Sequence, residues 1–335
     1  MTNKLLRASI LASAICQTAF PAGETVMNIF FIGNSFTQRH NLSLLFKTIA
    51  EEGQKNLKVN AEKVTYGGQT LFAHSELYFS HSLLELAVIS EDEIKERIRK
   101  MQALLQEKDS PEFYKNFWKE LGKAEYDWET VKKNITGAVK AHESWIAKKK
   151  ISLQPWDYVV LQSWQDITNK ENTGYFSYAV KLASLAAAQK TKVILYITAP
   201  YAMNQKSVTS PIESEKVFAD LKIAAQLQKK LNTVVVPVGL ALYYIQKQGT
   251  DLKFRYVNDF HPNQYCAYLT ACLFYTAVFN KSPEGLAFNT VTENKDQNGL
   301  DPDGGPLAIT IDEKTKTYLQ KTAWEAVQAF NNGKY

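Results

Sequence analysis

The feature that most constrains the fold is a regular alternation of short apolar segments with helical patterns. The apolar segments are rich in β-branched and aromatic residues at successive positions, which is typical of parallel strands buried on both faces. They span residues 28–32, 59–65, 158–162, 193–198 and 233–238. Helical patterns lie at 42–53, 175–189, 213–231 and 263–279. This repetition predicts a doubly wound α/β sheet, in which ligand sites form at the carboxyl ends of the strands.

One long interval interrupts the alternation. Residues 76–150 are rich in charge and have helical periodicity at 91–106, 111–121 and 128–147. We therefore expect a helical insertion between the second and third strands. Its aromatic residues, among them Trp118, Trp128 and Trp145, either line a sugar or acyl site or pack the insertion's own core.

The first 22 residues have the pattern of a secretion signal. Lys4 and Arg7 precede an apolar stretch at 8–20, and small residues up to Gly23 offer cleavage sites. We therefore expect export to the periplasm or secretion. The alternative is that this apolar start is buried in the fold. Residues 23–335 are expected to form one enlarged domain. No later segment has ~18 uninterrupted apolar residues, so we expect no membrane span.

Charge and cysteine content argue against several other classes. The formal net charge is +5 with no basic run longer than 148–150, which gives no support for nucleic-acid binding. Cys266 and Cys272 lie on one predicted helix with Cα atoms about 9 Å apart, beyond disulfide reach, so we expect both in the core. The acidic residues of 289–307 lack the spacing of a calcium loop, and this segment indicates a surface loop.

Common cofactor and metal motifs are absent. The chain has no G-x-G-x-x-G, no G-x-x-x-x-G-K-[ST], no H-E-x-x-H, no C-x-x-C and no G-x-S-x-G. The histidines do not cluster in the sequence. We therefore expect neither a cofactor nor a metal.

Polar residues follow the predicted strands. The sequence GNSFT begins at Gly33 after the first strand, and GGQT begins at Gly67 after the second, where glycine lets an amide approach an oxyanion. Gln162 ends the third strand, and either it or Gln165 is a candidate side-chain donor. Before the last helix, the sequence NDFHPN contains His261, which is a general-base candidate because it lies close to an acid.

These four blocks together resemble the SGNH, or GDSL-like, hydrolase superfamily, in particular its exported bacterial members whose first block reads Gly-Asn-Ser-Phe-Thr. The match covers residues 28–279 apart from the insertion. The resemblance implies a flavodoxin-like three-layer α/β/α fold with a five-stranded parallel sheet in the order 2-1-3-4-5. It also implies an esterase in which Ser35 is the nucleophile, His261 is the base, and the amides of Ser35 and Gly68 are oxyanion donors.

Two blocks depart from the family pattern. Gln162 or Gln165 occupies the region of the family's third-block asparagine, which leaves the third oxyanion donor open. The family has aspartate three residues before the histidine, where this chain has Asn258; Asp259 is two residues before it. Either Asp259 orients His261 through a different turn, or Asn258 does, or the enzyme works as a Ser-His pair, or the protein is inactive.

We expect an exported serine esterase that removes an acyl group, in the first place acetyl, from a carbohydrate. The alternative is a catalytically weak or inactive protein of the same fold that binds carbohydrate, and a lipid or thioester hydrolase is a third reading. The expected partner is a small-molecule or carbohydrate ester. Asn34, His74 and Trp164 are candidate substrate contacts, although His74 also suits a hydrogen bond at a helix start.

Overall fold

The structure is a computed structural model, and it describes residues 23–78, 89–148, 156–163, 166–168, 174–199, 214–259, 261–295 and 298–335. The expected secretion signal at 1–22 lies outside the described residues, as do Trp164 and Gln165. In the described part of the chain, no helix is both long and apolar enough to cross a membrane.

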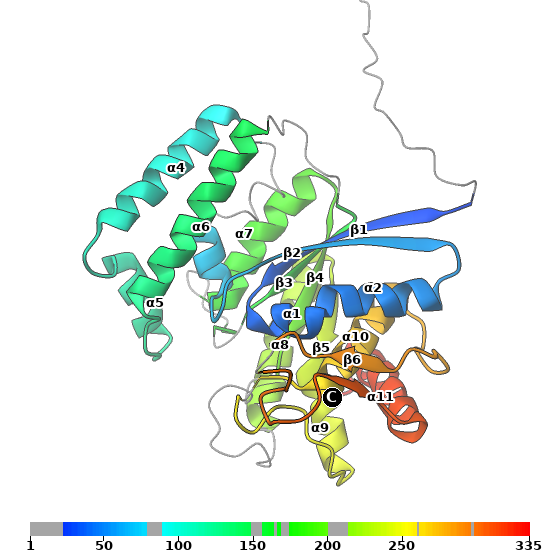
Figure 1. Cartoon of the computed structure of the whole chain (residues 1–335). Helices are drawn as coiled ribbons and strands as arrows, with labels where there is room; N and C mark the ends of the chain where they lie inside the picture. Colours follow the sequence, from blue (N-terminus) through cyan, green and yellow to red (C-terminus); the bar gives the residue numbers. More distant parts are fainter. Residues whose placement is uncertain are drawn as a thin grey trace, which may run out of the picture.

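Five parallel strands form the central sheet in the order β2-β1-β3-β4-β5 (Figure 1). The strands are β1 (Thr25–Gly33), β2 (Leu57–Thr65), β3 (Tyr158–Gln162), β4 (Lys192–Ile197) and β5 (Val234–Pro237). All five predicted strands are confirmed, but β2 is an edge strand and is only partly buried, not buried on both faces as expected. β1 is longer than predicted because its first residues pair with the start of β2. The parallel pairing brings all five carboxyl ends to one edge of the sheet.

Helices cover both faces of this sheet. The elements outside the insertion are α1 (Ser35–Gln38), η1 (Arg39–Asn41), α2 (Leu42–Gly53), η2 (Ala73–Leu77), α7 (Gly174–Ala188), α8 (Ser214–Leu231), α9 (Val238–Lys247), α10 (Gln264–Phe279) and α11 (Glu313–Asn331). On one face α10 packs between α2 and α11, and on the other α7 and α8 pack against β4. Because α10 is covered on nearly all sides, it is apolar around its whole circumference. The expected three-layer, flavodoxin-like α/β/α architecture is confirmed.

The helical insertion between β2 and β3 is also confirmed. It consists of α4 (Glu91–Gln106), α5 (Glu112–Glu120) and α6 (Trp128–Ala147), which pack together to one side of the sheet (Figure 1). Tyr114, Trp118 and Trp128 are buried in a separate apolar core, which the insertion shares with Phe72 and Tyr78. These aromatic side chains therefore pack the insertion's own core, as the second of the two sequence readings has it.

The C-terminal part of the chain corrects one prediction. Residues 289–307, expected to be a surface loop, contain β6 (Thr290–Thr292), which pairs antiparallel with β7 (Ala308–Thr310). Glu293, directly after β6, is only 1% exposed, so this segment packs onto the domain. Cys266 and Cys272 are both free and buried, as predicted.

Candidate active site

Ser35 is the first residue of α1, directly after the carboxyl end of β1. Asn34 is the N-cap of this short helix, and its side-chain oxygen accepts a hydrogen bond from the amide of Phe36 (3.1 Å). The Asn34 side-chain nitrogen donates to the carbonyl of Gln69 (2.9 Å). Asn34, which the sequence suggested as a substrate contact, is fully buried. Its side chain holds the nucleophile turn instead.

Gln162 fixes the same turn from β3. Its side-chain oxygen accepts from the amide of Asn34 (2.8 Å) and from the hydroxyl of Thr37 (2.9 Å), while its nitrogen donates to the carbonyl of Ser163 (3.0 Å). A Cβ at position 33 would lie 2.4 Å from Gln162 Oε1, so the close packing of Gln162 requires glycine at this position. Gln162 is 0% exposed and committed to these bonds, which disagrees with its expected role as an oxyanion donor.

The glycine block after β2 lies beside the nucleophile turn. The amide of Tyr66 donates to the carbonyl of Gly33 (3.2 Å), and Gly68 has a left-handed φ of +67°. A side chain at Gly68 would also collide with the Tyr126 hydroxyl, since a Cβ there would lie 1.6 Å from it. Both observations explain glycine at position 68. Its backbone is buried next to Gln69, whose carbonyl is bound by Asn34.

His74, another expected substrate contact, has a structural position. It is fully buried, and its Nε2 donates to the carbonyl of Gly33 (2.8 Å). Its ring packs against Tyr66, with 5.4 Å between the ring centroids. His74 therefore ties the segment after β2 to the end of β1.

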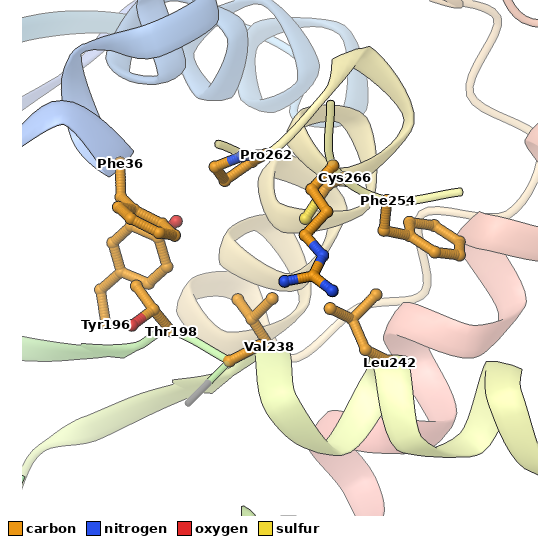
Figure 2. Close-up of a pocket in the computed structure, with 10 residues that line it drawn as sticks. Phe36, Tyr196, Thr198, Val238, Leu242, Phe254, Pro262 and Cys266 are labelled. Carbon is orange, nitrogen blue, oxygen red and sulfur yellow. The ribbon is translucent and has the colours of Figure 1, made fainter. Parts of the chain in front are cut away.

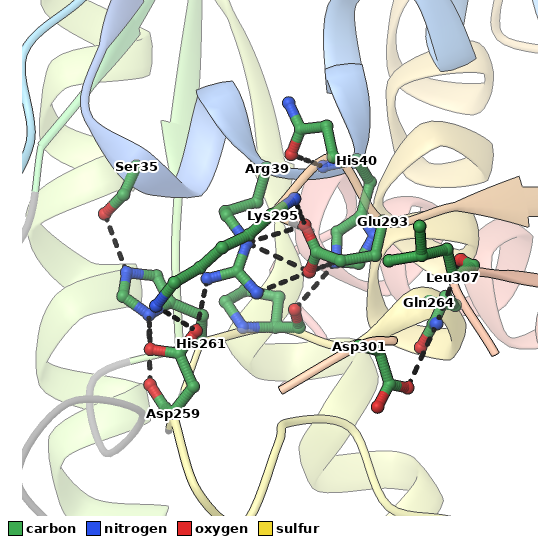
Figure 3. Close-up of polar contacts among 12 residues, drawn as sticks. Ser35, Arg39, His40, Asp259, His261, Gln264, Glu293, Lys295, Asp301 and Leu307 are labelled. Carbon is green, nitrogen blue, oxygen red and sulfur yellow. Dashed lines mark hydrogen bonds and ion pairs between the residues drawn. The ribbon is translucent and has the colours of Figure 1, made fainter. Parts of the chain in front are cut away.

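His261 lies opposite Ser35 on the loop before α10. Its Nε2 is 2.9 Å from Ser35 Oγ, and its Nδ1 is 2.9 Å from Asp259 Oδ1 and 3.0 Å from the Asp259 carbonyl (Figure 3). Since both neighbours of Nδ1 are acceptors, Nδ1 carries the proton, and Nε2 is left to accept a hydrogen bond from the serine hydroxyl. This is the tautomer that a general base requires.

A tight turn makes the two-residue spacing between Asp259 and His261 possible. The amide of His261 donates to the Asp259 carbonyl (2.6 Å), and the amide of Tyr256 donates to the His261 carbonyl (3.0 Å). An antiparallel bridge between Arg255 and Pro262 closes the turn. Asn258 is exposed, and its amide donates to Asp303 (2.9 Å). The structure thus brings the Asp259 carboxylate, rather than the Asn258 side chain, to the imidazole.

Charged residues that the sequence reading did not single out surround Asp259. Arg39 Nη1 lies 2.5 Å from Asp259 Oδ2, and Lys295 Nζ lies 3.1 Å from the same oxygen. Arg39 also pairs with the buried Glu293. Burial raises the pKa of Asp259, but hydrogen bonds from His261 and Arg39 outweigh it and hold the pKa well below its usual range. The carboxylate is therefore ionised throughout the physiological pH range.

One open cleft adjoins the Ser35 and His261 pair, and a smaller hollow lies beside Phe36 and Pro262, the residues that follow them in the sequence. An open cleft of ≈ 310 Å³ is lined by both residues and by Gln38, Asn294 and Lys295. A second, apolar hollow lies behind Phe36, between the ends of β4 and β5 (Figure 2). Its free volume is ≈ 10 Å³, which is room for about one water molecule. Within the described ranges, no group of three or more His, Cys, Asp or Glu side chains is placed to hold a metal ion.

Comparison with known proteins gives only distant similarities. No protein-family model matches the chain, and no curated protein matches it significantly. One similar solved structure is a proposed SGNH hydrolase from Slackia heliotrinireducens, with 15% identity and a TM-score of 0.40, covering 76% of this chain and 99% of that one. Another is a gut microbial diltiazem-metabolizing enzyme, with 12% identity and a TM-score of 0.33, covering 78% of this chain and 48% of that one.

Proposed function

We propose that this protein is a serine hydrolase of the SGNH type that cleaves carboxylic esters through an acyl-enzyme. The observation that carries the proposal is the unbroken chain of contacts from Ser35 Oγ to His261 Nε2 (2.9 Å) and from His261 Nδ1 to Asp259 Oδ1 (2.9 Å). The three side chains lie at the carboxyl edge of the sheet, where α/β folds form ligand sites.

The roles of the three residues follow from this chain. His261 takes the Ser35 proton as the serine oxygen attacks the ester carbonyl carbon, and it then gives that proton to the departing alcohol. Asp259 holds the imidazole in the required tautomer and stabilises the imidazolium that forms. A water molecule, deprotonated in the same way by His261, hydrolyses the acyl-enzyme and releases the acid. The proton that leaves with the alcohol is replaced by one from this water, which His261 passes to Ser35 Oγ as the acid departs, so the free enzyme is restored.

The oxyanion that forms in both steps needs donors near Ser35. We assign the backbone amides of Ser35 and Gly68 to this role because both belong to the turns that Asn34 holds together. For the third donor, Gln162 is committed to the nucleophile turn. Gln69 is as deeply buried as Gln162, but neither of its side-chain polar atoms has a hydrogen-bond partner in the described part, so it is the better candidate.

The two hollows favour a small acyl group and a polar alcohol. The apolar hollow behind Phe36 has room for about one water molecule, so it does not offer a pocket for a long acyl chain. The open cleft presents Gln38 and Lys295, which suits a hydroxyl-rich leaving group. An acetylated carbohydrate fits both features. The signal-like pattern at residues 1–22 favours an exported substrate of this kind.

The competing reading, an inactive carbohydrate-binding protein, has less support. It drew on the aromatic residues of the insertion, and Tyr114, Trp118 and Trp128 are buried in the insertion's own core. It also drew on Asn258, whose position before the histidine departs from the family, whereas Asp259 lies at hydrogen-bond distance from the imidazole. Only measured turnover separates the two readings.

The test is hydrolysis of p-nitrophenyl acetate, compared with p-nitrophenyl octanoate, by the purified wild type and three variants. Ser35→Ala should lower kcat/KM by ~10⁴. Asp259→Asn should lower it by ~10² to 10⁴, because the amide supplies no charge to the imidazolium. Asn258→Ala is the matched control for the neighbouring position and should change the rate little. Acetate should react faster than octanoate.

Two results would contradict the proposal. A Ser35→Ala variant that hydrolyses acetate at the wild-type rate would mean that another group does the chemistry. If instead Asn258→Ala is crippled and Asp259→Asn is unaffected, then Asp259 is not the residue that orients His261.

A further inference from the structure

Two cations bind the catalytic carboxylate on the side that faces away from the histidine. Asp259 Oδ1 faces His261, while Oδ2 contacts Arg39 Nη1 (2.5 Å) and Lys295 Nζ (3.1 Å) (Figure 3). Arg39 is 6% exposed and comes from η1, four residues after the nucleophile. Lys295 follows β6, and its side chain is 47% exposed at the mouth of the open cleft.

Arg39 is in turn neutralised by a buried carboxylate. Its Nε lies 2.8 and 2.9 Å from the two side-chain oxygens of Glu293, and its Nη2 donates to Glu293 Oε2 as well. The planar guanidinium can serve two carboxylates at once because its five N–H groups point in fixed directions. Glu293 is 1% exposed, and a charge buried this deeply requires a partner. The arrangement is therefore a built chain of contacts from Glu293 to Arg39 to Asp259.

We propose that Arg39 is a positioning residue for Asp259, and that Glu293 and Lys295 set the base strength of His261 by adjusting the net charge that Asp259 experiences. This inference rests on the proposed esterase function. It assigns Arg39 a geometric role: the bond to Oδ2 keeps Oδ1 aimed at the imidazole. It assigns the other two residues an electrostatic role.

The direction of the electrostatic effect follows from the charges. A cation beside Asp259 offsets part of the carboxylate's attraction for the imidazolium, so the histidine loses its proton more readily. Glu293 opposes this effect because it neutralises Arg39. Removing the charge of Glu293 should therefore weaken the base, and removing that of Lys295 should strengthen it.

The other titratable groups packed around Asp259 do not change this balance. Burial lowers the pKa of His40, which is neutral and donates to the carbonyl of Pro262 (2.8 Å). Burial raises the pKa of Tyr256, whose ring lies 5.4 Å from the Arg39 guanidinium, so it stays protonated. Asp303 binds the amides of Val257 and Asn258 rather than a side chain of the triad.

The electrostatic part is tested with Glu293→Gln and Lys295→Met. Two readouts are used: the pH dependence of kcat/KM for p-nitrophenyl acetate, and the protonation midpoint of His261 followed by NMR in a Ser35→Ala background. Glu293→Gln should lower the midpoint of the acidic limb and Lys295→Met should raise it, each by ~0.5 pH unit or more at low ionic strength. Added salt should reduce the Lys295 shift, because that side chain is exposed, more than the Glu293 shift.

The matched control is Glu51→Gln. Glu51 is likewise paired with a cation, Lys47, and it accepts a hydrogen bond from the backbone amide of Val59. It lies on α2, away from the carboxyl edge of the sheet. It should leave the midpoint unchanged.

The positioning part is tested with Arg39→Lys, which keeps the charge and loses the two-sided geometry. Its kcat should fall by ~10-fold or more because Asp259 is no longer fixed, while KM stays within ~2-fold. The midpoint of the acidic limb should move less than in Glu293→Gln.

The outcomes separate this inference from the proposed function. The electrostatic part would be overturned if Glu293→Gln and Lys295→Met shifted the His261 midpoint in the same direction, or if neither variant shifted it. If Glu293→Gln does not fold, the shift of the midpoint in Lys295→Met decides alone. An unchanged kcat in Arg39→Lys would overturn the positioning part. A wild type without Ser35-dependent turnover would instead overturn the esterase function, since the NMR titration does not depend on turnover.

Discussion

At the scale of single residues, each polar group around Ser35 that contacts the nucleophile turn has a defined partner. Asn34 uses its amide, its side-chain oxygen and its side-chain nitrogen in three different hydrogen bonds. Gln162 and Thr37 complete this set. A nucleophile on a four-residue helix needs such support, because a helix this short has almost no stability of its own. The side-chain amide of Gln69 differs, since it is buried without a partner among the described residues.

This difference gives a prediction for Gln69→Met, a change that keeps the length of the side chain. An unpaired buried amide costs about 1–3 kcal/mol, so its removal should raise the free energy of unfolding. If Gln69 is the third oxyanion donor, kcat should fall by ~10²-fold in the same variant. The measurements are denaturant unfolding and p-nitrophenyl acetate turnover.

The matched variant is Gln162→Met, which removes the acceptor of Asn34 and Thr37 and should lower stability. Greater stability of Gln69→Met with an unchanged kcat would show that Gln69 takes no part in the reaction.

Part of the site could be predicted from the sequence at this scale. Ser35 and Gly68 follow strands directly, and His261 precedes an apolar helix, so local patterns reveal them. Arg39 and Glu293 could not be found in this way because their ion pair joins positions 254 residues apart. The spacing of Asp259 from His261 left several orienting groups open, and only the turn geometry brings its carboxylate to the imidazole.

At the scale of elements, the segment between β6 and β7 braces the loop that carries His261. The carboxylate of Asp303 accepts from the amides of Val257 and Asn258, each at 2.9 Å. Asp301 holds that turn in place by accepting from the amides of Asp303 (2.9 Å) and Gly305 (2.7 Å). The acidic residues that the sequence reading assigned to a surface loop thus shape the candidate catalytic loop.

We therefore expect Asp303→Ala to loosen the turn before Asp259 and to lower kcat several-fold, with only a small effect on unfolding because Asp303 is exposed. The control is Asp312→Ala, which removes an aspartate that caps α11 by accepting from the amide of Thr315 (3.0 Å). Loss of that cap should cost ~1 kcal/mol of stability and leave kcat unchanged. Equal effects of the two variants on kcat would contradict a specific role for Asp303.

The long elements could be predicted because their residue patterns are strong. The helix α4 begins with a capping box between Ser90 and Glu93, and an inner strand such as β3 is a nearly continuous apolar run. β6 and β7 were missed because each has three residues, too few for any periodicity to show. Their pairing brings Thr290 opposite Thr310 across the long segment 293–307, which no local pattern indicates.

At the scale of the whole molecule, buried carboxyl groups link stability to pH. Asp166 follows β3 and is 0% exposed, and burial raises its pKa to about 7. Its Oδ1 accepts from the Ser163 hydroxyl (2.7 Å), while Oδ2 has no hydrogen-bond partner in the part of the chain that the structure describes. Burial likewise raises the pKa of Asp220, on α8, to about 6. Folding therefore makes both carboxyls easier to protonate than they are in the unfolded chain.

The sign of the pH effect follows from these shifts. In the unfolded chain an aspartate has a pKa of ~3.9, so between about pH 4 and pH 7 the unfolded state loses a proton that the folded state retains at Asp166. The stability that this carboxyl contributes is complete below about pH 4 and is lost as the pH rises through about 7, at up to ~1.4 kcal/mol per pH unit. Asp166→Asn, which resembles the protonated acid, should therefore change Tm little at pH 4 and raise it clearly at pH 8. The measurement is thermal unfolding of wild type and variant at both pH values, with the exposed Asp251→Asn as the control that should show no pH-dependent difference. A lower Tm for Asp166→Asn at both pH values would mean that the ionised carboxylate, bound by Ser163, is the stabilising form after all.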